Sequence, residues 1–140
     1  MPWSITEIHP LLVHFPIALF STGLFFDLLA ELLQKKELEQ SGFWCMLMGL
    51  VSCLFANTTG LFAFLEEGSI SDLPGFSHSL LIWASILLFA VLFWVRIQFQ
   101  LDLRYSNLKR NMYFLVHIIA VGILFYGAHL GAIHAGFSGD

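Results

Sequence analysis

The stretch Ser79-Leu-Leu-Ile-Trp-Ala-Ser-Ile-Leu-Leu-Phe-Ala-Val-Leu-Phe-Trp-Val95 decides the fold class. It carries no charged residue and, as a helix, is long enough to cross a hydrocarbon layer of about 30 Å. Three further stretches are also strongly apolar, and they are Ile8–Leu33, Trp44–Leu65 and Met112–Ile133. All four are apolar on every face and lack the alternation of a lipid-facing strand. The sequence therefore predicts an all-α integral membrane protein.

Composition and chain length support one bundle. The 140 residues are 58% hydrophobic and only 11% charged, which is outside the range of soluble proteins and fits a single domain over residues 1–140. Short connections make consecutive helices antiparallel neighbours, so we expect an up-down four-helix bundle. No Lys or Arg precedes the first stretch, so we expect it to be a mature helix and not a cleaved signal peptide.

The basic residues predict the orientation. They flank the first-to-second and third-to-fourth connections, and they are Lys35, Lys36, Arg96, Arg104, Lys109 and Arg110. Positive residues mark cytoplasmic connections, so both termini are expected on the outer face of a bacterial inner (cytoplasmic) membrane, with several passes through it. The net charge of -4 provides no basic patch, which argues against nucleic acid as a partner.

Histidines gather at the predicted outer end of the bundle. Five of the six are placed there by the topology, and they are His9, His14, His78, His129 and His134. An imidazole in lipid requires a partner, so a shared site built from three helices is the expected explanation. His14, His78 and His129 are the candidate ligands, for a metal or for a cofactor.

His9 and His134 are each five positions from a candidate ligand, which is about 140° around a helix. A helix therefore does not present both histidines of such a pair on one face. We expect His9 and His134 to be interfacial polar anchors, with a ligand role left open.

Small residues accompany these histidines. Gly127 and Gly131 form a Gly-x-x-x-Gly pattern in the fourth helix, and Gly60 ends Asn57-Thr58-Thr59-Gly60 in the second, a segment expected to face inward. Glycine lets another backbone or a flat cofactor approach closely. The pattern leaves helix packing and cofactor binding open, and all three glycines are candidate cofactor-binding positions.

Two ionisable residues lie toward the other end. Asp27 and His117 are at similar depth in the first and fourth helices, and an intramembrane carboxylate is costly unless it is neutral, paired or hydrated. We expect the two side chains to pair. A structural contact is the favoured interpretation, and a step in a proton path is the alternative.

The segment His9-Pro-Leu-Leu-Val-His-Phe-Pro-Ile-Ala-Leu19 resembles the first-helix motif HPxxVHFPIAL of the membrane protein family called domain of unknown function 2231. Thr59-Gly60, His78 and Gly127-Ala-His-Leu-Gly-Ala132 are weaker similarities, and the last departs from the family's GHLGG-like stretch by an inserted Ala128 and by Ala132. The resemblance covers the whole bundle. An association of related domains with cytochrome c modules implies electron transfer.

A b-type cytochrome is the first functional hypothesis. Two neutral imidazoles from facing helices would hold haem b without covalent attachment, and diagonal first and third helices would bring His14 and His78 to one iron. His129 would bind a propionate or take an axial position. The expected role is electron transfer with a quinol or a cytochrome as redox partner.

Two alternatives stay open. Copper or zinc would bind His14, His78 and His129, since imidazole suits both metals. Otherwise the chain is a non-catalytic membrane subunit of a redox or transport complex, or a homo-oligomer. No arrangement of nucleophile and base suggests a hydrolytic enzyme, so an electron-transfer or binding subunit is favoured.

Overall fold

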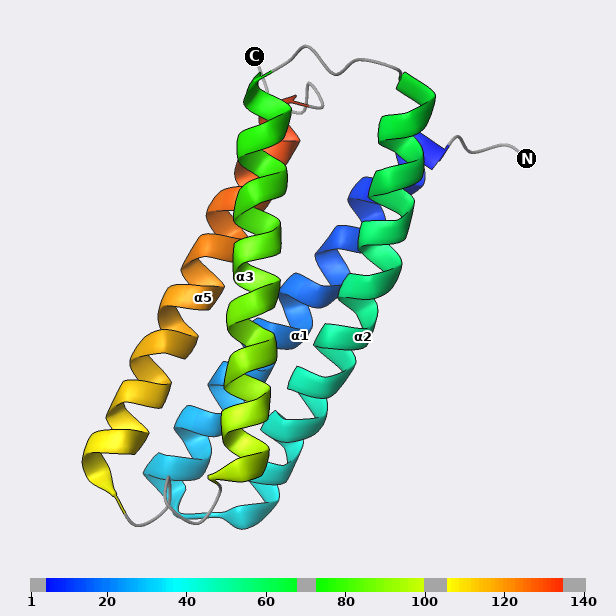
Figure 1. Ribbon diagram of the computed structural model, residues 1–140. Helices are drawn as coiled ribbons and strands as arrows, with labels where there is room; N and C mark the ends of the chain where they lie inside the picture. Colours follow the sequence, from blue (N-terminus) through cyan, green and yellow to red (C-terminus); the bar gives the residue numbers. More distant parts are fainter. Residues whose placement is uncertain (1–4, 68–72, 100–105, 135–140) are drawn as a thin grey trace.

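Four long helices make up the protein in a computed structural model that describes residues 5–67, 73–99 and 106–134. Within these ranges the side chains of 5–10, 61, 63–67, 73–79 and 134 are not described. The helices are α1 (Ile5–Leu33), α2 (Lys36–Glu67), α3 (Leu73–Gln98) and α5 (Asn107–His134), shown in Figure 1. All four are long and apolar enough to cross a membrane, which confirms the predicted all-α membrane class.

The helices extend beyond their predicted bounds. The expected connection from Gln34 to Phe43 is a turn of two residues, because α2 already begins at Lys36. Gln34 adopts a left-handed conformation with φ of 54°, and the Lys35 amide donates to the Ala30 carbonyl at 3.2 Å. This is the arrangement of a helix end closed by a left-handed residue, with glutamine where glycine is more common. The turn forces α1 and α2 into a tight antiparallel pair.

The third helix also begins earlier than its apolar stretch. It starts at Leu73, with Pro74 at its second position, where the missing amide hydrogen of proline costs nothing. His78, which directly precedes the apolar stretch, is therefore in the second turn of the helix. The hydropathy of the sequence marks only the apolar part of a helix, whereas the polar ends continue its hydrogen bonding.

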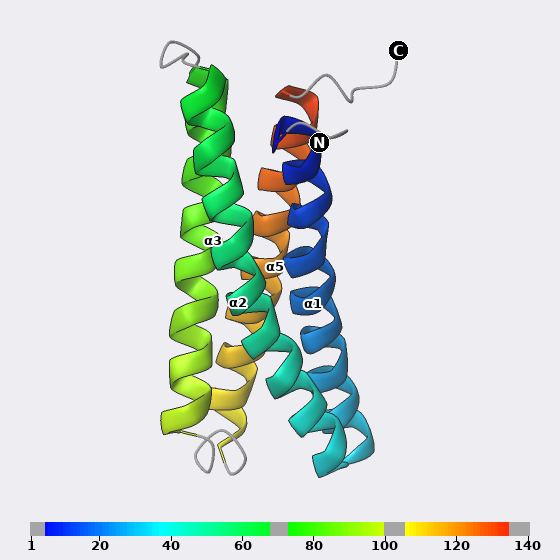
Figure 2. The same cartoon turned by 90° about the vertical axis from the view of Figure 1, so that its right-hand side faces the viewer.

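The helices form two antiparallel pairs. The closest neighbours are α1 with α2 and α3 with α5, while α1 also contacts α5 and α2 contacts α3. In the described part of the chain, α1 is thus diagonal to α3, as the up-down topology predicts. Figures 1 and 2 both show the first turns of α1 and the last turns of α5 at the same end of the bundle. We call this end the terminal end, and the opposite end, with the Gln34–Lys35 turn, the basic end.

Buried residues recur with heptad spacing on every helix. The series are Pro16, Phe20, Gly23 and Asp27 on α1; Gly42, Met46, Gly49, Cys53 and Ala56 on α2; Ser85, Phe89, Leu92 and Arg96 on α3; and Tyr113, His117, Ala120, Leu124 and Gly127 on α5. Every buried residue among the described side chains belongs to one of these series. Alternating steps of three and four residues are the pattern of left-handed helix packing.

The four series combine into layers across the bundle. From the basic end these layers are Asp27, Gly42, Arg96 and Tyr113; Gly23, Met46, Leu92 and His117; Phe20, Gly49, Phe89 and Ala120; Pro16, Cys53, Ser85 and Leu124; and Val13, Ala56, Ile82 and Gly127. Contacts support this register, because the rings of Phe20 and Phe89 stack at 3.7 Å and a Cβ on Gly127 would lie 3.2 Å from Ile82.

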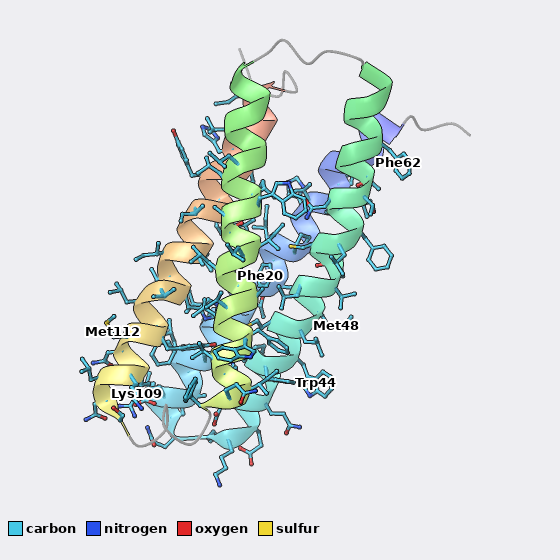
Figure 3. All side chains as sticks on the ribbon, in the orientation of Figure 1. Phe20, Trp44, Met48, Phe62, Lys109 and Met112 are labelled. Carbon is cyan, nitrogen blue, oxygen red and sulfur yellow. The ribbon has the colours of Figure 1, made fainter. Side chains whose placement is uncertain are left out.

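The faces opposite these series are apolar and exposed. Figure 3 shows Phe20 inside the bundle, whereas Trp44, Met48 and Phe62 extend away from it. Large exposed apolar side chains on all four helices are what a lipid environment requires, since water would disfavour such a surface.

Glycines allow α1 and α2 to approach closely. A Cβ on Gly49 would lie 2.7 Å from the Phe20 ring, and a Cβ on Gly42 would collide with the Asp27 carboxylate. Small residues at helix interfaces let dispersion contacts form where lipid offers no hydrophobic driving force. The α1–α2 pair therefore depends on these two positions.

We predict that Gly49→Ala lowers the free energy of unfolding by about 1–3 kcal/mol, because the stacked Phe20 ring is fully buried and must shift. Thermal or denaturant unfolding in detergent measures the change. Gly122→Ala is the matched control, since a Cβ there meets nothing within 4 Å. Equal effects of the two substitutions would contradict the packing argument.

Candidate functional site

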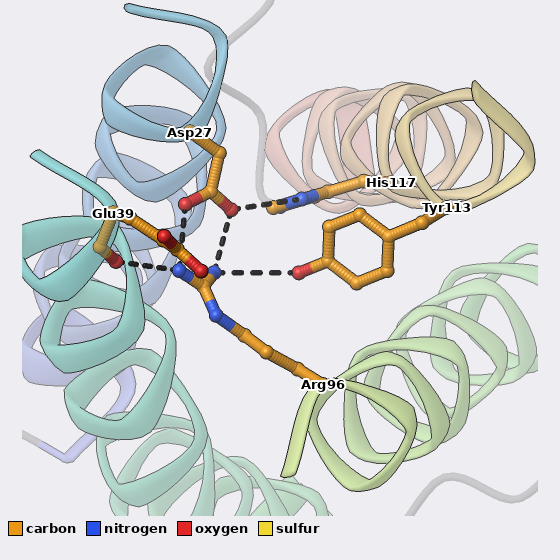
Figure 4. A network of polar contacts seen from close by, with 5 residues as sticks. All are labelled: Asp27, Glu39, Arg96, Tyr113 and His117. Carbon is orange, nitrogen blue, oxygen red and sulfur yellow. Dashed lines mark hydrogen bonds and ion pairs between the residues drawn. The ribbon is translucent and has the colours of Figure 1, made fainter. Parts of the chain in front are cut away.

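A buried ion pair lies in the layer nearest the basic end. Arg96 donates from Nη1 to Asp27 Oδ2 at 2.6 Å and from Nη2 to Asp27 Oδ1 at 2.8 Å. The residues are 6% and 5% exposed. Figure 4 shows this two-bond geometry, in which the planar guanidinium faces the carboxylate. Such charge-assisted pairs are among the stronger and more directional hydrogen bonds in proteins.

Further groups extend the ion pair to all four helices. Arg96 Nη2 also donates to the Glu39 carbonyl of α2 at 2.5 Å, and Nη1 approaches the Tyr113 hydroxyl of α5 at 3.4 Å. His117 Nδ1 lies 3.9 Å from Asp27 Oδ2. The cluster, which we call the charge network, consists of Asp27, Glu39, Arg96, Tyr113 and His117 (Figure 4).

The sequence identified only part of this network. The predicted proximity of Asp27 and His117 is confirmed, but 3.9 Å exceeds a hydrogen bond, and Arg96 is the main partner of the carboxylate. Arg96 flanks the connection after α3 as predicted, since it lies in the last turn of that helix, but its side chain is buried in the bundle, which the sequence analysis did not anticipate. No signal in the sequence marks this burial, because the heptad series that includes Arg96 is visible only in the packed bundle.

His117 is enclosed by aromatic rings. Its ring is fully buried and meets Phe89 and Tyr113 edge to face, with centroids 5.7 and 5.8 Å away. Among the residues that the structure describes, neither ring nitrogen has a partner in hydrogen-bond geometry, although the Phe20 backbone lies near the ring. The enclosure by aromatic rings makes the imidazole part of the packed core of the bundle.

The charge network is best explained as a structural element. Removing two charges from water is expensive, and a bidentate pair with additional donors and acceptors compensates for much of that cost. The network connects α1 to its diagonal neighbour α3 and fixes their relative position along the bundle. No described path of ionisable residues leads from it to the terminal end, where most histidines are.

The predicted ligands His14 and His129 lie on the outward faces of their helices. His14 shares its face with Leu11 and Phe15, which are 68% and 60% exposed, and it falls about 150° from the buried series of α1. His129 is exposed beside Phe125 and Tyr126 on α5. The structure brings neither imidazole into the interior of the bundle.

The other predicted positions continue the buried series. Gly127 is buried, and a Cβ there would lie 3.2 Å from Leu81 Cβ, so helix packing accounts for this glycine. Gly60 and Gly131 are half-buried and occupy the next heptad step after Ala56 and Gly127. The backbone of His78 occupies the corresponding step of α3, and its side chain lies outside the described ones.

Asn57, Thr58 and Thr59 do not all face inward as expected. The Thr58 side chain is exposed, and its hydroxyl donates to the Phe55 carbonyl of its own helix at 2.8 Å. Thr59 donates to the Ala56 carbonyl at 2.9 Å, whereas the buried Asn57 Nδ2 has no hydrogen-bond acceptor among the residues that the structure describes. A hydroxyl that donates to a carbonyl of the preceding turn has a hydrogen-bond partner without entering the core.

No cluster of three or more His, Cys, Asp or Glu side chains suited to a metal is present among the described side chains, which exclude His9, His78 and His134. At the terminal end the structure therefore gives the backbone positions of these histidines, whereas at the basic end it also gives the contacts between side chains.

Comparison with known proteins gives one match. A family model described as predicted membrane protein (DUF2231) matches residues 6–136, which covers all four helices. No curated protein and no solved structure matches the chain.

We predict that Asp27→Asn and Arg96→Gln each lower the free energy of unfolding by about 3–5 kcal/mol, because each leaves one buried charge without its counter-charge. The double variant is expected to lose less than the sum of the two, since neither charge remains. Unfolding in detergent measures all three variants.

The control is the pair of Arg110 and Glu31, which are 3.1 Å apart and whose side chains are 23% and 38% exposed. Glu31→Gln should change stability by less than about 1 kcal/mol, as is usual for exposed pairs. An additive double variant, or a control as damaging as Asp27→Asn, would show that the buried pair does not act as a unit.

Proposed function

We propose that this chain, which belongs to the family of predicted membrane proteins called DUF2231, is a b-type cytochrome-like protein that binds haem through histidines at its terminal end and transfers electrons. The observation that supports this function is the placement of His78. Its position continues the buried series of α3, and Gly60 on α2 and Gly131 on α5 continue the series of the two helices beside it. A histidine position is thereby flanked by two positions without side chains.

This arrangement suits a flat cofactor with an iron centre. Haem can be held by imidazole from helices that face each other, and the α1–α3 diagonal provides such a pair of helices. Glycine on α2 and α5 leaves space at the level where the macrocycle would lie. Haem bound there would supply one-electron redox chemistry, while the protein would bind it, orient it and exclude water with the aromatic side chains of the bundle.

The orientation is part of the proposal. Lys35, Lys36, Lys109 and Arg110 lie at the basic end, even though Arg96 is buried. With that end in the cytoplasm, both termini and the haem face the periplasmic side of a bacterial inner membrane. A quinol in the bilayer or a cytochrome outside it is the redox partner that this location would serve.

The outward placement of His129 favours a second candidate, a non-catalytic membrane subunit. Its imidazole lies on an exposed face within a predicted membrane span, where a polar group is costly unless it contacts a partner. A second copy of the chain or a larger redox complex would cover this face. A copper or zinc ion at the terminal histidines is the remaining alternative, and elemental analysis distinguishes it.

We predict that detergent-purified protein from haem-supplied cells shows a sharp Soret band and, after dithionite reduction, α and β bands. His78→Ala should abolish these bands or change them to those of a five-coordinate haem, because it removes an iron ligand. Absorption spectroscopy measures the bands of the wild type and of the variant. His129→Ala is the control. His117→Ala is a poor control because its ring belongs to the core. A featureless wild-type spectrum would overturn the haem proposal, and bound copper or zinc would then support the metal alternative.

We also predict that alkaline phosphatase fused after Asp140 is active in intact cells, whereas green fluorescent protein fused there is dark. The reason is that the positive residues at the basic end retain that end in the cytoplasm. Fluorescence without phosphatase activity would reverse the proposed orientation.

A further inference from the structure

The two diagonal helices α1 and α3 keep one constant offset. Asp27 and Arg96, which form the ion pair, are 69 positions apart. Phe20 and Phe89, whose rings stack with an angle of 3° between their planes, have the same separation. The two helices run in the same direction, so residues with this separation lie at equal depth along the bundle.

The same offset joins two histidines. His9 on α1 and His78 on α3 have the separation of the ion pair and of the stacked rings. Both positions belong to the backbone that the structure describes as helical. The first-helix motif contains both His9 and His14 and does not distinguish them. His14 has no histidine at the corresponding position of α3.

The heptad phase agrees with the depth. Stepping back from Pro16 along the buried series of α1 leads through half-buried Val13 to position 9. Stepping back from Ser85 on α3 leads through half-buried Ile82 to position 78. Each histidine therefore occupies the core register of its helix, whereas His14 lies on the exposed face.

The glycines complete a sixth layer. The register places Gly60 of α2 and Gly131 of α5 at the level of His9 and His78. The third and the fifth layers below show the same composition in observed contacts. A large pair on α1 and α3 accompanies a glycine on α2, with Phe20, Phe89 and Gly49 in one layer and Asp27, Arg96 and Gly42 in the other. In each observed case the two diagonal side chains meet across the bundle.

We infer that His9 and His78 would hold the iron of the proposed haem, at the level of Gly60 and Gly131, and that His14 and His129 would not bind it. The inference rests on the proposed haem binding and names its ligands. His9 lies about 6 Å, by helix rise, from the described start of α1, and His78 about 8 Å from that of α3. A cofactor at this depth is close enough to the terminal end for electron exchange with a partner there.

The test is the spin state and coordination of the haem iron in four variants. The wild type is expected to be six-coordinate and low-spin. His9→Ala should give a five-coordinate, high-spin spectrum that added imidazole returns to low-spin, because His78 still holds the iron. His14→Ala and His129→Ala should keep the wild-type spectrum. Absorption and electron paramagnetic resonance spectra, with circular dichroism as the measure of folding, provide the readouts.

A second variant protects the test against loss of folding. His9→Met should retain a six-coordinate haem and raise its midpoint potential, since thioether ligation favours the reduced iron. A change of spin state in His14→Ala with none in His9→Ala would overturn the inference while haem binding itself stands. Absence of haem from the wild type would overturn both the proposed function and the ligand assignment.

Discussion

The fold depends on one buried ion pair that connects diagonal helices. Asp27 and Arg96 exchange two hydrogen bonds across the bundle, in a layer that excludes solvent from both side chains. A shift of α3 by one turn against α1 would leave each charge buried without its counter-charge, at a cost of several kcal/mol. Apolar contacts alone tolerate such a shift more easily, because neighbouring apolar side chains are nearly interchangeable. The pair therefore fixes the register that every other layer follows.

Small residues make that register possible. Gly42 and Gly49 on α2 allow α1 to approach so closely that the Asp27 carboxylate and the Phe20 ring occupy the space of their missing side chains. Gly127 has the same role between α5 and α3. Dispersion forces between such closely packed helices replace the hydrophobic effect, which does not distinguish helix from lipid. The glycines and the ion pair thus act together: one sets how close the helices are, and the other sets their offset.

Five of the six histidines belong to three structural environments. His117 is enclosed in the core next to the charge network, and its neighbours are aromatic rings. His14 and His129 are on outward faces, where lipid or another protein would contact them. His9 and His78 occupy core positions at the terminal end in the backbone register. The proposed cofactor site between α1 and α3 and the alternative proposal of a docking surface outside the bundle are compatible, because they use different histidines.

The sequence by itself determined the class and much of the topology. Uninterrupted apolar stretches predict membrane helices, and short connections predict antiparallel neighbours, because both follow from the length of a helix and the thickness of a bilayer. The proximity of Asp27 and His117 was also predictable, since a carboxylate in a membrane needs a partner.

The tertiary structure alone decided which faces point inward. On helices that are apolar all round, hydropathy has no direction, so the sequence did not distinguish His14 from His9 or reveal that Arg96 is buried. Only the packed bundle shows the heptad series, because contact between helices, and not polarity, selects the buried face of a membrane helix.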